Sequence, residues 1–452
     1  MTSKGRALVV SDIHMGPAGP LETFRDEVAL AAFFDRLAAD DTAPPTELVL
    51  AGDCFDFLQV AGYDGFDAAR AAERFDTILR APRTERVMRA LRRFAQRPDA
   101  EITLLAGNHD PEMLVPEVRR RFAEAIGRTE GTVRFADDEP LRHAEGDRPP
   151  IWGRALEEGA VWIVHGDRWD PSNMIHRGEL AASIREGRPF ALPAGSCLVF
   201  EVLQKLKPEH GWVDELKPEM PAVLLLLLYL DAPTTWEHIR KQWRLTARLF
   251  TDTVMASLRV GPLFGERSEA PRALPEDPVD ALAALLAGSL RAEADPAAVL
   301  AGLDGYLRGR VEAPSGTLAP HHGIRRHFAR AWLENIRRAD RFQHKEEPDA
   351  VREAALPSLP GSVIALVAGH THGKRLRSAR RPIYANAGTW IPVGAIPPGD
   401  IESLIDQLDG GPGWPAEAPR TFVQIELGDG RPRISLGACD ADGTPRRLGD
   451  GT

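Results

Sequence analysis

Five short clusters of Asp, Asn and His each follow a segment with the pattern of a β-strand, and this arrangement limits the fold more than any other feature. The apolar segments span residues 7–11, 47–51, 102–106, 161–164 and 363–368. The clusters that follow them read SDIH, GDCFD, GNHD, HGD and GHTH. Ligands of α/β sheets usually bind at the carboxyl ends of the strands. We therefore expect the five clusters to converge on one site.

Helical patterns lie between these strands in the first third of the chain. Residues 21–39 have apolar side chains at helical spacing, Val28 among them, and residues 84–94 place Val87 and Leu91 on one face. Further strands are expected near the C-terminus, at 382–385, 422–426 and 433–436. The alternation of strands and helices predicts an α/β fold.

The pattern changes between residues 171 and 360, where helical spacing replaces strand signals. Segments such as 279–290 and 297–307 suit helices, and stretches rich in Pro and Gly separate them. We therefore predict a core formed by residues 1–170 and 361–452, with a large helical insertion at 171–360. Within the second part of the core, the Gly-, Pro- and acid-rich residues 397–419 are expected to form a surface loop.

Composition narrows the class of protein. The 452 residues carry a formal net charge of -10, which argues against broad nonspecific binding to nucleic acid. The three cysteines show no zinc-type spacing and suit a reducing compartment. The N-terminus lacks the pattern of a signal peptide, and the longest apolar run, 222–230, is well short of the roughly 20 residues that span a bilayer. We expect a cytoplasmic protein without a transmembrane segment.

The clusters supply oxygen and nitrogen ligands and no thiolate, which favours Mn, Fe, Zn, Co or Mg over a structural zinc site. In Asp12-x-His14 and His370-x-His372, an extended backbone would point both side chains of each pair to the same side. Glycines beside the candidate ligands permit sharp turns and close approach. The candidate metal ligands are Asp12, His14, Asp53, Asn108, His165, His370 and His372.

Such ligands suit hydrolysis of a phosphate ester. One carboxylate can bridge two divalent metal ions about 3.5–4 Å apart. A metal lowers the pKa of its bound water from 15.7 to about 7, and thus supplies a hydroxide nucleophile at neutral pH. The sequence therefore predicts a metal-dependent phosphoric ester hydrolase with two divalent metal ions, manganese foremost.

The motifs, in this order, resemble those of the calcineurin-like metallophosphoesterase superfamily: D-x-H, GD-x-x-D, GNH-D/E, H and GH-x-H. The resemblance covers about residues 5–170 and 361–390. It implies a four-layer β-sandwich flanked by helices, interrupted here by a large helical cap.

The resemblance also implies a role for each residue. Asp53 would bridge two metals, His109 would act as general acid or contact the phosphate, and Asp110 would orient His109. Asp56 would support the site, or simply cap a turn or helix. One metal would be held by Asp12, His14 and His372, and the other by Asn108, His165 and His370.

Substrate class stays open between alternatives. HGDRWD, the helical insertion and YANAGTW are similar to the UDP-2,3-diacylglucosamine hydrolase branch, which cleaves a lipid-linked pyrophosphate. GNHD departs from that branch, which usually has Arg in place of His, and the insertion is longer. A nucleotide or nucleic-acid phosphodiesterase is the main alternative, and a non-catalytic scaffold is disfavoured because no ligand is missing. Arg168 and Asn386 are candidate substrate contacts, although a surface or turn role suits them as well.

The apolar run 224–228 also has more than one interpretation. It suits the buried core of the cap, an acyl pocket or peripheral contact with a membrane. The sequence sets no oligomeric state.

Overall fold

The computed structural model describes residues 5–40, 43–136, 160–214, 226–241, 307, 325–326, 328–330, 333, 349–378, 382–394, 399–409, 416–427 and 432–451. Contacts divide the chain into two compact units. The first unit contains residues 1–200, 346–394 and 415–452, and the second contains 201–345 and 395–414. The predicted helix at 279–290 lies outside the described residues, and so does the one at 297–307 apart from residue 307.

A seven-stranded sheet forms the centre of the first unit, in the order β13-β12-β11-β1-β2-β3-β4. Strands β1 to β4 run parallel, whereas β11, β12 and β13 add antiparallel pairs at the other side. Its strands are β1 (Gly5–Val10), β2 (Thr46–Ala51), β3 (Ala100–Leu105), β4 (Arg134–Ala136), β11 (Thr421–Leu427), β12 (Pro432–Cys439) and β13 (Pro445–Gly451).

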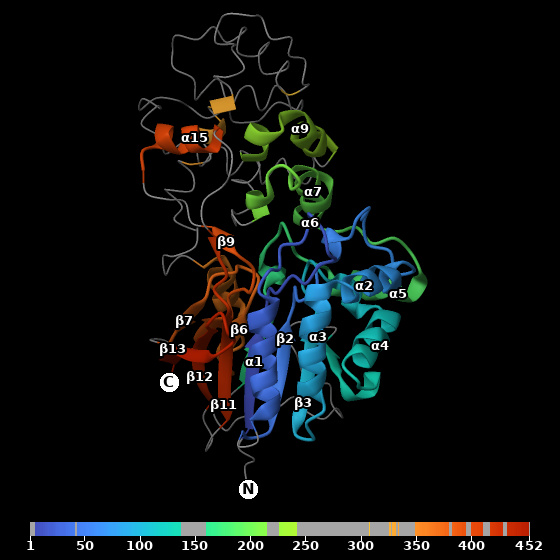
Figure 1. Cartoon of the computed structure of the whole chain (residues 1–452), viewed down its shortest axis with the longest axis vertical. Helices are drawn as coiled ribbons and strands as arrows, with labels where there is room; N and C mark the ends of the chain where they lie inside the picture. Colours follow the sequence, from blue (N-terminus) through green and yellow to red (C-terminus); the bar gives the residue numbers. More distant parts are fainter. Residues whose placement is uncertain are drawn as a thin grey trace, which may run out of the picture. The chain divides into compact units, whose positions relative to one another are not determined.

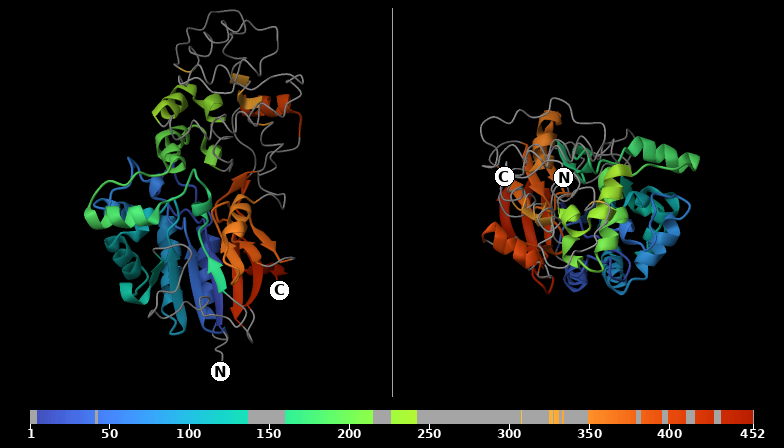
Figure 2. Two further views of the ribbon diagram at one scale, coloured as in Figure 1. Left: turned by 180° about the vertical axis from the view of Figure 1, so that it is seen from behind. Right: turned by 90° about the horizontal axis from the view of Figure 1, so that it is seen from above.

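A four-stranded sheet, in the order β5-β6-β8-β7, forms a second layer. Strands β5, β6 and β8 run parallel, and β7 is antiparallel to β8. In Figure 2 its orange strands are grouped beside the blue strands of the first sheet. Its strands are β5 (Ala160–Ile163), β6 (Val363–Ala368), β7 (Arg375–Arg377) and β8 (Ile383–Asn386). A separate pair joins β9 (Val393–Gly394) and β10 (Ala416–Glu417).

Alternating side chains of the strands build the layers, because successive residues of a strand point to opposite faces. In β1, Ala7 and Val9 belong to the apolar core shared with β5, β6 and β8. Leu8 and Val10 belong instead to the core beneath the helices. Two sheets therefore face each other across one core, as in a β-sandwich.

Helices cover the outer faces of both sheets. Helices α1 and α3 lie side by side over β1–β3 (Figure 1). On the four-stranded sheet, Leu366 and Tyr384 form a core with Val351 and Ala355 of α14. The predicted α/β fold, a β-sandwich flanked by helices, is thus confirmed. Helices of this unit are α1 (Glu27–Ala39), α2 (Ala71–Leu79), α3 (Pro82–Ala95), α4 (Pro116–Ala125), α5 (Arg177–Glu186), α6 (Ala194–Leu198) and α14 (Ala350–Ala355).

Short 3-10 turns follow several strands and complete the unit. They are η1 (Phe57–Gln59), η2 (Pro111–Leu114), η3 (Glu130–Thr132), η5 (Asp167–Trp169) and η8 (Leu356–Ser358). A π-helical segment, η6 (Val199–Leu203), crosses the boundary between the two units.

The regular secondary structure among the described residues of the second unit is helical. They include α7 (Gln204–Leu206), η7 (Gly211–Asp214), α9 (Ala232–Lys241) and α15 (Ile401–Asp409). Arg326 pairs with Glu402, Asp406 and Asp409 of α15 at N–O distances of 3.0, 2.9 and 3.1 Å. The expectation of a surface loop over 397–419 is therefore wrong at 401–409. This amphipathic helix buries Leu404, Ile405 and Leu408.

The boundaries of the second unit differ from the predicted insertion. Residues 171–200 and 346–360 belong to the sandwich unit, and 395–414 belong to the helical one. In the run 224–228, Leu226, Leu227 and Leu228 are fully buried. That the helices act as a cap over the site stays a prediction. Among the described residues, no helix is long and apolar enough to cross a membrane.

Candidate metal centre

Five parallel strands end at the candidate site. The loops after β1, β2 and β3 carry the first three clusters, and the loops after β5 and β6 carry the other two. Backbone hydrogen bonds join these loops: the His14 amide donates to the Asp53 carbonyl (2.9 Å), and the Gly369 amide donates to the His165 carbonyl (2.8 Å). The structure therefore brings the five clusters together, from both sheets of the sandwich.

The ligand candidates have an unusual backbone conformation. Among the described residues, six non-glycine residues have a positive φ, and five of them are candidate ligands: Asp12, His14, Asp53, His370 and His372, with φ between 50° and 69°. A non-glycine residue in this region costs on the order of 1–3 kcal/mol, and such residues gather at functional sites. The expectation of an extended backbone at Asp12–His14 and His370–His372 is therefore wrong. Tight left-handed turns aim these side chains.

Two glycines leave room for the carboxylates. A Cβ atom at Gly107 would overlap the carboxylate of Asp53, and one at Gly369 would overlap Ser11 and the carboxylate of Asp12. Any larger residue at these positions would displace a candidate ligand. The glycines of GNHD and GHTH thus fit a crowded polar centre.

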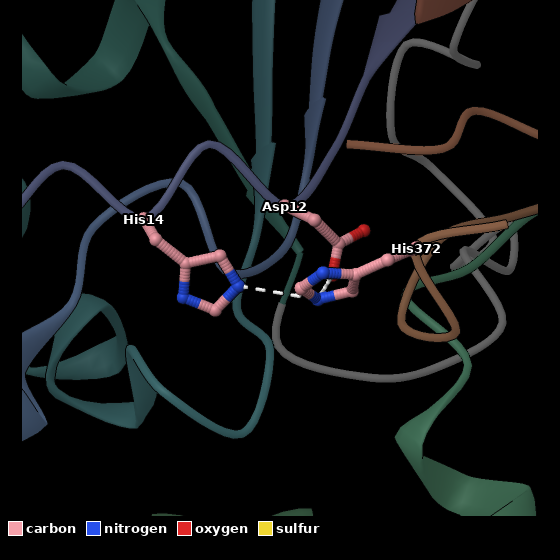
Figure 3. A group of neighbouring side chains, drawn as sticks. All are labelled: Asp12, His14 and His372. Carbon is pink, nitrogen blue, oxygen red and sulfur yellow. Dashed lines mark hydrogen bonds and ion pairs between the residues drawn. The ribbon is translucent and has the colours of Figure 1, made fainter. Parts of the chain in front are cut away.

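Asp12, His14 and His372 form one group, drawn in Figure 3. One ligand atom of each lies within 4.8 Å of those of the others. The Asp12 Oδ1 atom is 3.2 Å from His372 Nε2, and His14 Nε2 is 3.4 Å from His372 Nε2. Among the described residues, the buried Asp12 Oδ1 has no hydrogen-bond partner of good geometry. These atoms point at one common position.

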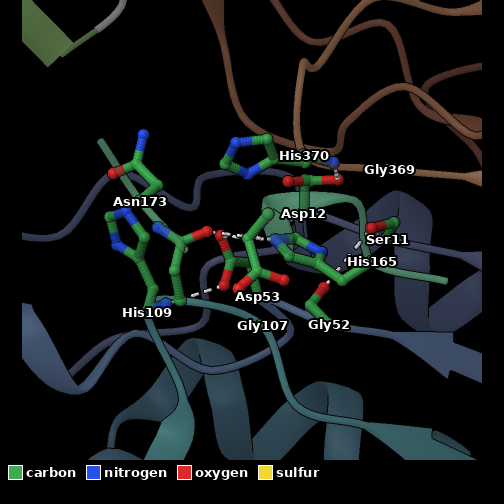
Figure 4. Close-up of polar contacts among 12 residues, drawn as sticks. Ser11, Asp12, Gly52, Asp53, Gly107, His109, His165, Asn173, Gly369 and His370 are labelled. Carbon is green, nitrogen blue, oxygen red and sulfur yellow. Dashed lines mark hydrogen bonds and ion pairs between the residues drawn. The ribbon is translucent and has the colours of Figure 1, made fainter. Parts of the chain in front are cut away.

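Asp53, His165 and His370 form a second group (Figure 4). The side chain of Asn108 lies beside it, next to His165. His165 Nε2 is 3.3 Å from Asp53 Oδ2 and 3.2 Å from Asn108 Oδ1. Asp53 Oδ2 also lies 4.0 Å from Nε2 of His14. The Asp53 carboxylate therefore stands between the two groups, where a bridging ligand would stand.

The donor set fits divalent cations. His165 Nδ1 lies 3.0 Å from the carbonyl oxygen of Ala51, and His14 Nδ1 lies 3.0 Å from Asp56 Oδ2. Both oxygens are acceptors, so each Nδ1 carries the proton and each Nε2 turns its lone pair inward. His165 Nε2 then faces two more lone-pair carriers, the oxygens of Asp53 and Asn108. Only a proton or a cation satisfies all three.

The charges in the centre support one another. Burial disfavours the anion of Asp53, but His165 and His109 outweigh it and hold the pKa of Asp53 well below its ordinary value. Burial likewise opposes the charge of His165, yet the carboxylate of Asp53 raises its pKa well above the ordinary value. The carboxylate of Asp53 is therefore anionic and attracts positive charge.

His109 lies at the edge of the centre, and its partner differs from expectation. His109 Nδ1 is 3.1 Å from Asp56 Oδ2, and the same oxygen is bound by His14 and accepts from Gln59 Nε2 at 2.7 Å. Asp56, the candidate support residue, thus orients His109, and nothing in the sequence marked Gln59. Because Nδ1 of His109 faces a carboxylate, Nε2 is the nitrogen that would face a reacting group.

Asp110 has another role. Its carboxylate accepts hydrogen bonds from four backbone amides, those of Asp53, Cys54, Phe55 and Gly107, at 2.6–3.2 Å. The expectation that Asp110 orients His109 is therefore wrong. It fixes the turn that carries Asp53, because a buried carboxylate with four N–H donors holds their backbone in place.

The two candidate substrate contacts lie in different surroundings. Arg168 is half-buried, and its guanidinium lies 5.2 Å from the ring centre of Trp169. Asn386 is fully buried, and its amide donates to the Gly369 carbonyl (2.8 Å) and to Thr371 Oγ1 (3.0 Å). These hydrogen bonds show that Asn386 supports the GHTH loop. They do not point to the expected substrate contact. Substrate contact by Arg168 stays a prediction.

A further carboxylate, Asp170, lies beside the centre. Its Oδ2 atom is 3.0 Å from His370 Nε2 and accepts from Asn173 Nδ2 at 2.6 Å. Its place in HGDRWD, five residues after His165, was the available sequence signal. A carboxylate on one ring nitrogen orients a metal-ligating histidine.

Sequence comparison agrees with the fold and with the candidate metal centre. Residues 5–206 match the family described as calcineurin-like phosphoesterase. The fifth motif, at His370 and His372, follows this stretch in the chain and meets the other four in space. This stretch carries the first four motifs and is similar to the calcineurin-like phosphoesterases, which indicates a metal-dependent phosphoesterase. No curated protein matches the chain.

Proposed function

We propose that the chain hydrolyses a phosphoester or pyrophosphate bond at a centre of two divalent cations, with Mn²⁺ as the foremost candidate. The observation that carries this proposal is the position of Asp53, whose Oδ2 lies 3.3 Å from His165 Nε2 and 4.0 Å from His14 Nε2. One cation would be held by Asp12, His14 and His372. The other would be held by Asn108, His165 and His370.

Cations held there would lower the pKa of a water molecule to about 7 and offset charge on phosphoryl oxygens. The side chains supply the rest. Asp53 orients both halves of the centre, and its Oδ1 accepts from the His109 amide at 2.8 Å. That bond ties His109 to the bridging carboxylate. Asp56 keeps the His109 ring in place, so that Nε2 can give a proton to the leaving oxygen.

The substrate is a phosphate-containing molecule. A lipid-linked nucleotide pyrophosphate is the first candidate, because HGDRWD, the helical unit and YANAGTW are similar to the UDP-2,3-diacylglucosamine hydrolase branch. A nucleotide or nucleic-acid phosphodiesterase is the alternative. The net charge of -10 weighs against long polynucleotides. We expect the reaction to take place in the cytoplasm.

A substrate panel on the full-length protein tests the proposal. Metal-free protein receives Mn²⁺ and is assayed with p-nitrophenyl phosphate, bis-p-nitrophenyl phosphate and a nucleotide-sugar pyrophosphate with acyl chains. We expect Mn²⁺-dependent hydrolysis of at least one of them, lost in Asp53→Asn. Asp35→Asn is the matched control, because Asp35 is an exposed carboxylate paired with Arg93 on the surface.

Hydrolysis that persists without cations, or in Asp53→Asn at the wild-type rate, would refute the two-cation assignment. Absence of both cation binding and hydrolysis would leave a non-catalytic scaffold as the function. The relative kcat/KM values of the diester and the lipid-linked pyrophosphate decide between the two substrate classes.

A further inference from the structure

Arg177, at the start of α5, makes several side-chain hydrogen bonds next to the centre. Its two terminal nitrogens donate to the two oxygens of Asp167, Nη1 to Oδ2 at 2.6 Å and Nη2 to Oδ1 at 2.9 Å. Nη2 also donates to the carbonyl of Ala106 at 2.8 Å, and Nη1 to that of Ile175 at 3.0 Å. One guanidinium thus holds a carboxylate and two backbone carbonyls.

The partners of Arg177 belong to the loops that carry two candidate ligands. Ala106 precedes Asn108 by two residues, after β3 of the seven-stranded sheet. Asp167 follows His165 by two residues, after β5 of the four-stranded sheet. Arg177 therefore joins the two sheets at the point where Asn108 Oδ1 and His165 Nε2 come within 3.2 Å of each other.

Burial makes this connection rigid. The Asp167 side chain is fully buried and that of Arg177 is only 11% exposed. Asp167 Oδ2 also accepts the Ile175 amide at 3.0 Å. A two-pronged Arg–carboxylate pair fixes geometry as well as charge, and Lys cannot reproduce it because an ammonium is a point donor.

The arrangement concerns one half of the centre. The hydrogen bonds described above join Arg177 and Asp167 to each other, to Ala106 and to Ile175, whereas Asp12, His14 and His372 meet on the other side of Asp53. Movement of the Arg177 fork would change the spacing between Asn108 and His165 directly. It would change the Asp12 group only through the rest of the fold.

We propose that Arg177 is a positioning residue for the cation held by Asn108, His165 and His370: its fork to Asp167 and its bond to Ala106 set the distance between the ligand loops of the two sheets. The inference rests on the proposed two-cation function. The affinity of this half of the centre for its cation would then depend on Arg177, a side chain that contacts neither the cation nor the substrate.

Calorimetric titration of the metal-free, full-length protein with Mn²⁺ tests the proposal without an activity assay. We expect two binding steps in wild type. In Arg177→Lys we expect the Mn²⁺ affinity of one step to fall by about 10–100-fold, while that of the other stays within about threefold. A loss of this size is usual when the hydrogen-bond partner of a metal ligand is removed. The matched control is Arg93→Lys, which removes the same kind of fork, to Asp35 at 2.6 and 2.8 Å, from the exposed surface. We expect it to bind as wild type.

A second variant guards against loss of the fold. Asp167→Asn keeps the shape of the side chain and one carbonyl acceptor, and should weaken the same step. Unchanged binding in both variants, or equal weakening of both steps, overturns the positioning role. Loss of helical circular dichroism at 25 °C in both variants also overturns it, since the pair would then serve the fold as a whole. Failure of wild type to bind two cations refutes the proposed function itself, which separates the two failures.

Discussion

Nε2 of His14 lies 3.4 Å from Nε2 of His372, within a centre that is almost closed to solvent. Two imidazole lone pairs repel each other at this distance unless a proton or a cation lies between them. With Nδ1 of His14 directed to Asp56, the protein has placed both nitrogens where a shared cation would bind. This relationship leads to the first prediction.

Removal of metal should lower stability. A cation that binds only the folded state at 100 times its dissociation constant adds about 2.7 kcal/mol to the free energy of unfolding. We expect dialysis against EDTA to lower Tm and added Mn²⁺ to restore it in wild type. In Asp12→Asn the Mn²⁺-dependent rise should shrink, whereas Asp35→Asn should behave as wild type. An equal Mn²⁺ effect in wild type and Asp12→Asn would contradict the ligand role of Asp12.

Replacement of His109 by Gln should lower kcat most for substrates with poor leaving groups. A general acid contributes roughly 10²–10⁴-fold, and the contribution is needed when the leaving oxygen is strongly basic. We expect His109→Gln to lower kcat by that range for alkyl phosphate esters and by much less for p-nitrophenyl esters. The measurement is the slope of log kcat against the pKa of the leaving group. A slope equal to that of wild type would rule out proton donation by His109.

Substitutions of Asp56 and Asp110 should have different effects on the dependence of kcat on the leaving group. Asp56→Asn replaces the anionic acceptor of the His109 and His14 rings by a neutral amide and should steepen the leaving-group slope as His109→Gln does. Asp110→Asn instead turns an amide N–H₂ towards backbone donors, which costs about 1–3 kcal/mol for each buried group left unsatisfied. We expect a lower free energy of unfolding in urea with an unchanged slope. A steeper slope in Asp110→Asn would show that Asp110 orients His109 after all.

The positions of the motif-bearing strands and the convergence of the clusters could be predicted from sequence, because each apolar run ends in ligand-type residues and such residues gather at the carboxyl ends of strands. The local geometry could not. An Asp-x-His pair fits an extended strand as well as a left-handed turn, and only the surrounding backbone decides; φ is 53° at Asp12 and 54° at His14.

The partners of the side chains could not be predicted from the sequence either. Asp110 follows His109 in the chain but binds backbone amides, whereas Asp56, 53 residues away, holds the ring. Val28 fits the apolar face of α1 by spacing yet is 50% exposed, since the buried face is centred on Leu30, Phe33 and Phe34. Arg177 carries no motif at all. Such contacts depend on how loops from two sheets meet, and no local pattern encodes that.

Glu112, in η2, gives a prediction on pH that is separate from the centre. The side chain is fully buried; Oε1 accepts from the Tyr63 hydroxyl at 2.8 Å and lies 3.8 Å from Arg74 Nη1, whereas Oε2 accepts no hydrogen bond. Burial raises the pKa of Glu112 from the ordinary 4.5 to about 7, against the smaller opposing effects of Tyr63 and Arg74. The folded protein therefore binds a proton that the unfolded chain releases.

The sign follows from this difference. Between pH 4.5 and about 7 the folded state holds more protons than the unfolded state, so the contribution of Glu112 to stability is full below pH 4.5 and is lost as pH rises through about 7. A shift of this size corresponds to at most about 3 kcal/mol, at 1.36 kcal/mol per pKa unit. In Glu112→Gln, which stays neutral, that loss should disappear. We expect the difference in unfolding free energy between variant and wild type, measured in urea at a series of pH values, to rise in favour of the variant from pH 4.5 to 7. The exposed Glu124→Gln is the control. A difference that does not change with pH would show that Glu112 titrates alike in the folded and unfolded chains.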